Sequence, residues 1–137
     1  PPRSGLEIVL VAAALLLDKD GRILVTQRPE GKSMAGMWEF PGGKVEQGES
    51  PEYALMRELR EEIDIETRPC GFYPLAFASH SYEKFHLMMP LFACRVWRGI
   101  PQGQEGQSLK WIRPEELYNL EMPAADIPLI APILEYL

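Results

Sequence analysis

The chain has 137 residues, 46% of them hydrophobic and 25% charged, which are the proportions of an ordinary globular protein. This length can bury a core without disulfide or metal staples, and it fits one domain over residues 1–137. The formal net charge of −6 at pH 7 argues against duplex DNA or an anionic membrane as the primary partner. It does not exclude small polyphosphates, because bound divalent cations can reverse the local field.

Two apolar segments open the chain. Residues 6–17 form a nearly unbroken hydrophobic run, and a run of about a dozen residues is too short to cross a bilayer as a helix. The turn signal Asp-Lys-Asp-Gly and a second apolar segment, residues 22–27, come next, so we predict two buried strands joined as a hairpin. Arg28 then stands at the mouth of a polar loop. Its guanidinium would suit a phosphate or a base edge, although most single arginines at strand ends are simply solvated.

A glycine-rich loop at residues 42–48 precedes the clearest helix signal. Ser50 is a favoured N-cap and a proline follows it, so we predict that a helix begins near Ser50. At about 100° per residue, Glu58, Glu61 and Glu62 share one arc of the helix surface. Clustered oxygens of this kind suit Mg²⁺ or Mn²⁺. The alternative is a solvated face on which arginines pair with these acids.

These residues carry a family resemblance. Gly43 is followed after five residues by Glu49, and after seven more by the run Arg-Glu-Leu-Arg-Glu-Glu at residues 57–62. This spacing resembles the box of the Nudix hydrolases, which would occupy residues 43–65. The resemblance extends over nearly the whole chain and implies the Nudix α/β/α sandwich, an α/β fold with a mixed β-sheet between helices. Asp64 departs from the pattern, because it replaces a glycine at a left-handed helix end, a conformation that Asp tolerates well.

The approach to the box, Trp-Glu-Phe-Pro-Gly-Gly-Lys at residues 38–44, is similar to that of the MutT-like branch. The resemblance implies catalysis by Mg²⁺, or alternatively Mn²⁺, held by carboxylates and one backbone carbonyl. It also implies an arginine that keeps the acids in place. The expected metal ligands are the Gly42 carbonyl, Glu58, Glu61, Glu62 and Glu105. Arg57 is expected to hold Glu49 and the acidic cluster in place. The residues expected to contact the substrate are Arg28, Glu39 and Lys44.

Strand patterns return after the helix. Residues 72–79 and 85–96 are rich in aromatic and aliphatic side chains and are predicted to form a hairpin. Two histidines in this region, His80 and His86, have no partner at metal-ligand spacing, so we assign them to packing or substrate contact. Residues 99–107 form a predicted flexible loop. Its single acid, Glu105, is in a Glu-Gly-Gln context that resembles the metal-binding position of MutT-like enzymes, whereas an isolated loop glutamate is normally solvated.

The C-terminal part contains a candidate for base recognition. A short strand at residues 108–113, a short helix opening at Pro114 and a final helix ending at Leu137 are predicted here. The family's guanine-specific prototype has an asparagine ahead of the last helix, where this chain has Ala125 and then Asp126. An ionised carboxylate can only accept hydrogen bonds, so Asp126 would accept from oxidised guanine or from the amine of cytosine. The alternative is that Asp126 caps the following helix.

The resemblance implies hydrolysis of a nucleoside triphosphate to the monophosphate and pyrophosphate. The expected substrate is 8-oxo-dGTP, whose removal sanitises the nucleotide pool. The alternatives are (d)CTP or 5-hydroxy-(d)CTP, or a module that senses nucleotides without cleaving them. Bound metal would neutralise phosphate charge, with Glu58 or Glu105 accepting the proton of the attacking water. We expect a cytoplasmic protein with free cysteines and with no membrane or stable nucleic-acid partner, and the oligomeric state is left open.

Overall fold

The computed structural model describes residues 6–137, so the predicted extent of the domain over residues 1–5 lies outside it. Four strands precede the first α-helix in this part of the chain, three more strands follow it, and the chain ends in a second α-helix. The elements are β1 (Glu7–Leu16), β2 (Ile23–Gln27), β3 (Trp38–Glu39), β4 (Gly42–Lys44), α1 (Pro51–Ile63), η1 (Pro69–Gly71), β5 (Tyr73–Ser81), β6 (Phe85–Cys94), β7 (Ser108–Ile112), η2 (Pro114–Asn119), η3 (Ile127–Leu129) and α2 (Ile130–Tyr136).

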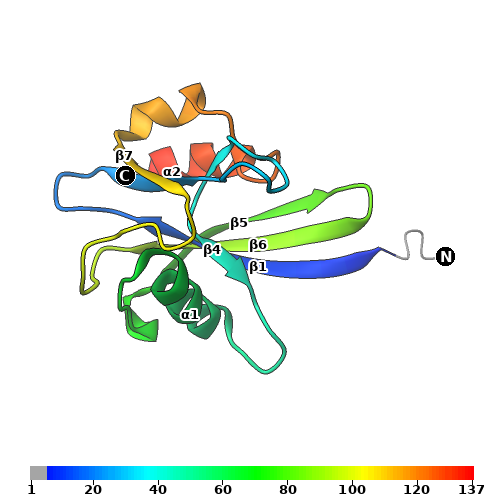
Figure 1. Cartoon of the computed structure of the whole chain (residues 1–137), viewed down its shortest axis with the longest axis horizontal. Coiled ribbons are helices and arrows are strands. Elements are labelled where there is room, and N and C mark those ends of the chain that lie inside the picture. Colours follow the sequence, from blue (N-terminus) through cyan, green and yellow to red (C-terminus); the bar gives the residue numbers. More distant parts are fainter. Residues whose placement is uncertain (1–5) are drawn as a thin grey trace.

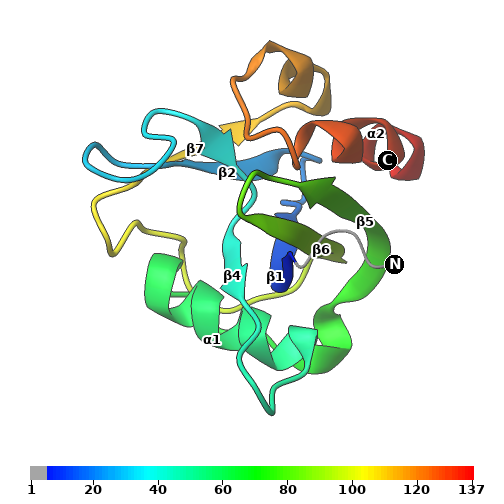
Figure 2. The same ribbon diagram turned by 90° about the vertical axis from the view of Figure 1, so that its right-hand side faces the viewer.

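The strands form two sheets. A four-stranded mixed sheet has the order β4-β1-β6-β5, in which β1 and β6 run parallel and the other neighbours are antiparallel. The second sheet is antiparallel, with the order β3-β2-β7. Helices α1 and α2 lie on opposite sides of the mixed sheet (Figure 1), and the same layers are seen after a 90° turn (Figure 2). This is the predicted α/β/α arrangement with a mixed sheet.

The burial of β1 explains the apolar run near the N-terminus. Even-numbered residues from Ala12 to Leu16 pack in the core beneath α1, whereas Ala13 and Leu15 face the core shared with β2 and α2. A strand covered on both faces needs an apolar residue at nearly every position. The outer half of β1 is different, because Ile8 and Leu10 are exposed.

The predicted pairing of the first two strands is wrong. β1 and β2 belong to different sheets and are joined only by the isolated bridge between Leu17 and Ile23 and by a turn in which Asp18 N donates to Arg22 O at 3.0 Å. The reason is that β4 and β6 already occupy the two edges of β1. The predicted turn between β1 and β2 is therefore confirmed, and the predicted pairing of β1 with β2 is not.

Helix α1 begins and ends where its sequence predicts. Ser50 is the N-cap, and its hydroxyl accepts a hydrogen bond from Tyr53 N at 3.2 Å. The apolar arc packs fully into the core through Leu55, Leu59 and Ile63. The helix ends at Asp64, whose φ of 59° and ψ of 43° are the left-handed values expected of the glycine that it replaces.

The remaining elements follow the sequence with small shifts. β5 and β6 form the predicted hairpin. The short helix after Pro114 is a 3-10 helix, and the last helix starts with a 3-10 turn at Ile127–Leu129 before becoming α-helical. Cys70 and Cys94 are both free, as predicted. In residues 6–137 no helix has the length and hydropathy needed to cross a membrane.

Candidate active site

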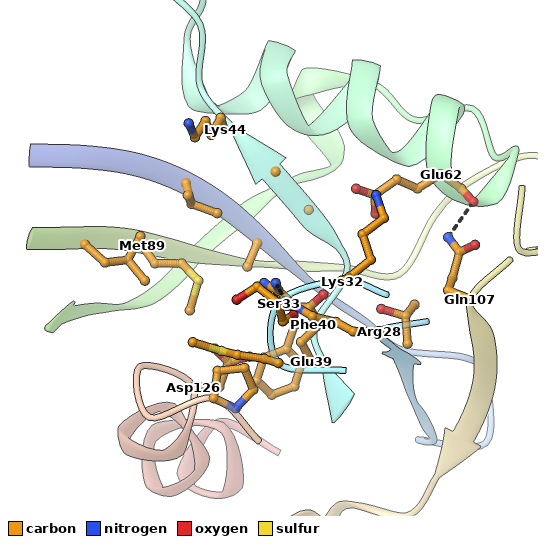
Figure 3. A pocket seen from close by; sticks show the side chains of 18 of the residues that line it. Arg28, Lys32, Ser33, Glu39, Phe40, Lys44, Glu62, Met89, Gln107 and Asp126 are labelled. Carbon is orange, nitrogen blue, oxygen red and sulfur yellow. Dashed lines mark hydrogen bonds and ion pairs between the residues drawn. The ribbon is translucent and has the colours of Figure 1, made fainter. Parts of the chain in front are cut away.

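A cavity of about 470 Å³ is bounded by β1, the end of β2, the chain from β3 to β4, and the tip of the β5–β6 hairpin. Figure 3 shows Glu62 on the α1 side of this cavity, with Glu39 and Asp126 nearer to α2. The cavity thus has two acidic ends joined by an apolar wall. The predicted site residues that line it are Arg28, Glu39, Gly42, Lys44, Glu62, Glu105 and Asp126.

Arg57 is the centre of an ion-pair network beside the cavity. Its Nη2 and Nε atoms bind the two carboxylate oxygens of Glu49 at 2.8 and 2.9 Å, and Nη2 also donates to the Lys44 carbonyl at 3.0 Å. Its Nη1 lies 2.9 Å from Glu58 Oε2 and 3.5 Å from Glu61 Oε1. Hydrogen bonds from Arg57, and then from the Glu46 amide, lower the pKa of Glu49 to about 2. Arg57 therefore ties the loop after β4 to the acidic face of α1.

The two glycines of β4 allow this close approach. A Cβ atom on Gly43 would lie 2.2 Å from Glu58 Cδ, so the Glu58 carboxylate occupies the space that any other residue would fill. A Cβ atom on Gly42 would lie 2.0 Å from the backbone oxygen of Ala12 in the neighbouring strand. Glycine is required at Gly42 because the clash there is with backbone, whereas at Gly43 a larger residue would displace the Glu58 carboxylate.

Three acids, Glu39, Glu58 and Glu105, act on the half-buried side chain of Glu62. Burial, then the hydrogen bond and charge of Glu58, and then the charges of Glu105 and Glu39 together raise the pKa of Glu62 to about 9. Arg57 is engaged by Glu49 and Glu58 and does not offset this repulsion. The neighbouring carboxyl groups and burial therefore disfavour the ionised form of Glu62.

Glu105 reaches the cluster because its loop caps the C-terminus of α1. Gln104 N donates to the Glu62 carbonyl at 2.9 Å, and Gln102 N donates to the Ile63 carbonyl at 2.9 Å. The side chain of Gln107 donates to the Glu62 carbonyl at 3.0 Å and accepts from Glu105 N at 2.8 Å. These contacts of Gln107 were not predicted from the sequence. They could have been anticipated, because the last carbonyls of a helix need hydrogen-bond donors from outside the helix.

The donor set fits a hard divalent cation. All the candidate ligands are oxygens, which Mg²⁺ and Mn²⁺ prefer, and a cation would relieve the repulsion around Glu62. Within residues 6–137, no three His, Cys, Asp or Glu side chains already stand in position to hold a metal. Glu61 is exposed and pairs with Arg57 instead. The fold thus places the carboxylates near one another, and their side chains would have to change rotamer to bind a metal together.

The opposite end of the cavity is built around Asp126, which is 5% exposed. Burial and the nearby charge of Glu39 raise the pKa of Asp126 to about 7, against the opposing effects of the Phe40 backbone and of Arg28. Arg28 Nη2 binds Glu39 Oε1 at 3.0 Å, and its buried Nε has no partner. The capping alternative for Asp126 is wrong, because its side chain makes no capping hydrogen bond to η3.

The histidines and one unpredicted aromatic residue complete the surroundings. His86 lies between Ser79 Oγ at 2.7 Å and Ser81 Oγ at 2.6 Å, and it does not line the cavity. The His80 ring packs edge-on against Tyr82, with 4.7 Å between ring centroids. Tyr82, which the sequence interpretation did not single out, lines the cavity. The apolar wall is completed by Val9, Val11, Phe85, Leu87 and Met89.

Known proteins resemble this chain along most of its length. The family model described as "NUDIX domain" matches residues 12–132. The CTP pyrophosphohydrolase of Escherichia coli (strain K12) is 43% identical over 124 residues, covering 89% of this chain and 89% of that protein. The 8-oxo-dGTP diphosphatase of Haemophilus influenzae is 38% identical over 135 residues, covering 93% of both. The solution structure of the E. coli ORF135 protein has a TM-score of 0.85 at 35% identity, covering 98% of this chain and 94% of that one.

These similarities agree with the box spacing, the α/β/α layers and the acids gathered beside the glycines of β4. The fold class and the resemblance expected from the sequence are confirmed. The chain belongs to the Nudix family and is a MutT-like hydrolase acting on phosphoric anhydrides.

Proposed function

We propose that this protein is a magnesium-dependent pyrophosphohydrolase that converts 8-oxo-dGTP to the monophosphate and pyrophosphate. The observation that carries the proposal is the polarity of one cavity. The acids around Glu62 lie at one end, suited to a metal-bound phosphate chain, and the buried Asp126 lies at the other, suited to a base.

Nudix hydrolases use divalent metal ions and act on small nucleotides. In this chain we assign metal binding to Glu58, Glu61, Glu62, Glu105 and the Gly42 carbonyl. When bound, Mg²⁺ or Mn²⁺ neutralises phosphate charge and lowers the pKa of the attacking water. Arg57 and Glu49 keep the acidic face of α1 in place, Glu58 or Glu105 accepts the proton of water, and Lys44 and Arg28 contact the substrate.

The choice of an oxidised purine depends on the protonation of Asp126. A carboxyl group with a pKa of about 7 is partly protonated near neutral pH, so it can donate one hydrogen bond and accept another. Asp126 then offers the same donor and acceptor pair as an asparagine. This pair matches a base edge that has a carbonyl beside a ring N–H, as oxidised guanine has.

A second candidate substrate is CTP or its oxidised deoxy form. Support comes from the E. coli relative named CTP pyrophosphohydrolase. The ionised form of Asp126 would accept a hydrogen bond from the exocyclic amine of cytosine. The two candidates differ in pH dependence, since cytosine recognition would strengthen as Asp126 ionises and recognition of the oxidised purine would weaken.

Other proposals follow from the substrate. We place the protein in the cytoplasm because nucleoside triphosphates are used there, and its two free cysteines are compatible with a reducing compartment. Residues 1–137 are proposed to form one Nudix domain, with its box at residues 43–65. A small nucleotide is the proposed partner, without a stable nucleic-acid complex.

The test is a kcat/KM panel of canonical and oxidised nucleoside triphosphates with Mg²⁺, with identification of the products. We expect pyrophosphate release, with 8-oxo-dGTP preferred. Glu62→Gln or Glu61→Gln should lower metal-dependent turnover by at least about 100-fold while leaving the fold intact by circular dichroism. Near-normal turnover in both variants would refute the metal assignment, and a preference for CTP would select the second candidate.

A further inference from the structure

Tyr82 connects the β5–β6 hairpin with the loop that precedes α2, at the end of the cavity that contains Asp126. It lies at the tip of the β5–β6 hairpin, where its own N–H donates to the Phe85 carbonyl at 2.8 Å. Its ring packs against His80 at 4.7 Å and against Phe85 at 5.1 Å between centroids. The backbone and the ring of Tyr82 are therefore fixed by the hairpin.

The hydroxyl of Tyr82 reaches the loop that precedes α2. It accepts a hydrogen bond from Ala125 N at 3.3 Å. Ala125 is fully buried, and a buried amide without an acceptor is costly, so this contact is needed by the loop as well as by the tyrosine. The next residue is Asp126, whose N–H is bound to the Pro123 carbonyl at 2.9 Å. The loop is thus held internally and by the hairpin, and the Asp126 carboxyl group also accepts a hydrogen bond from the Phe40 backbone.

We propose that Tyr82 is a positioning residue for base recognition: its hydroxyl holds the Ala125 amide and so fixes Asp126, while its ring forms part of the wall against which the base lies. The inference rests on the proposed function, in which Asp126 contacts the base. It assigns to the hairpin tip a part in substrate choice, although the tip lies outside the Nudix box at residues 43–65.

Tyr82→Phe tests the hydroxyl alone, because the ring and its packing are kept. Losing one neutral hydrogen bond should raise KM for the preferred triphosphate about fivefold, with kcat unchanged. The preference over other bases should fall by a similar factor. Tyr118→Phe is the matched control, since Tyr118 is 62% exposed and does not line the cavity, and it should change neither value.

A double-mutant cycle shows whether Tyr82 acts through Asp126. If it does, adding Tyr82→Phe to Asp126→Ala should not reduce base preference further. The inference would be overturned if the losses of base preference in the two single mutants multiplied in the double mutant, or if Tyr82→Phe left KM unchanged. The hydrogen exchange of the Ala125 amide gives an independent readout, and it should quicken in Tyr82→Phe and remain unchanged in Tyr118→Phe.

The Asp126→Ala variant tests the proposed base recognition separately from the role of the Tyr82 hydroxyl. If Asp126→Ala keeps the full base preference, Asp126 does not recognise the base, and the proposed specificity of Tyr82 fails with it. The Ala125 exchange rate would still decide whether the hydroxyl holds the loop. Tyr82→Leu, which removes the ring as well as the hydroxyl, should raise KM for every triphosphate above its value in Tyr82→Phe, and equal KM values in the two variants would exclude the ring from the substrate wall.

Discussion

Substituting Gly43 with alanine should separate activity from stability. Gly43 has no positive φ, so its backbone accepts an L residue without strain. The new Cβ would lie 2.2 Å from Glu58 Cδ, and moving to an ordinary contact near 3.4 Å displaces the carboxyl group by about 1.2 Å. A displacement of this size in a catalytic group costs about 100-fold in rate. The end of a glutamate can swing away cheaply, so unfolding free energy should fall by only about 1 kcal/mol or less.

The assay is kcat/KM at saturating Mg²⁺ together with urea denaturation. Gly48→Ala is the matched control: Gly48 has a φ of +87° and open space around its Cβ position, so this variant should lose about 1 kcal/mol of stability with normal activity. The two alanines should thus cost similar amounts of stability, and only Gly43→Ala should lose activity. Wild-type kcat/KM in Gly43→Ala would show that the position of the Glu58 carboxylate does not matter, and it would refute the reasoning.

Three further predictions concern a helix end, a loop and a buried acid. Asp64→Gly relieves left-handed strain at a φ of 59° and should add up to about 1 kcal/mol of stability, seen as a Tm higher by about 3 °C with unchanged turnover; a large loss of activity would contradict this. Gln107→Leu removes the side-chain bonds that place the Glu105 loop and should lower kcat/KM at least about tenfold, measured with Mg²⁺, whereas an unchanged rate would show that the loop is held without them. Asp126 has a pKa raised from 3.8 to about 7, so its stability contribution is fully present below about pH 4 and is lost as pH rises through 7. Asp126→Asn should therefore match the wild type in urea denaturation at low pH and exceed it by up to about 4 kcal/mol at pH 9; equal stability at both pH values would exclude ionisation of a buried carboxyl group.

Local signals in the sequence predicted most of the fold. The cap at Ser50, the buried arc of α1 and the left-handed end at Asp64 depend on residues close in the chain, so they could be predicted without the structure. The β5–β6 hairpin is local for the same reason. The pairing of β1 was predicted wrongly, because periodicity shows that a strand is buried on both faces and does not show which strands lie beside it.

The site divides in a similar way. The acids of α1 were identified from their spacing, and the structure places one of them, Glu58, against Gly43. The contacts of Gln107 and Tyr82 with other segments were not identified, because each depends on a tertiary approach between distant parts of the chain. The burial of Asp126 was also beyond a sequence argument, since a polar residue ahead of a helix is usually a cap.

The parallel pairing of β1 with β6 has a consequence during protein synthesis. β1 leaves the ribosome before β6, and its partner residues, beginning with Phe85 opposite Glu7, emerge only after α1 and β5 have been made. A nascent chain that ends before Phe85 therefore carries an apolar strand with one unsatisfied edge, and such edges associate with one another. Ribosome-bound chains halted before β6 should remain protease-sensitive and recruit chaperones, and both properties should disappear once the sequence through Cys94 has emerged.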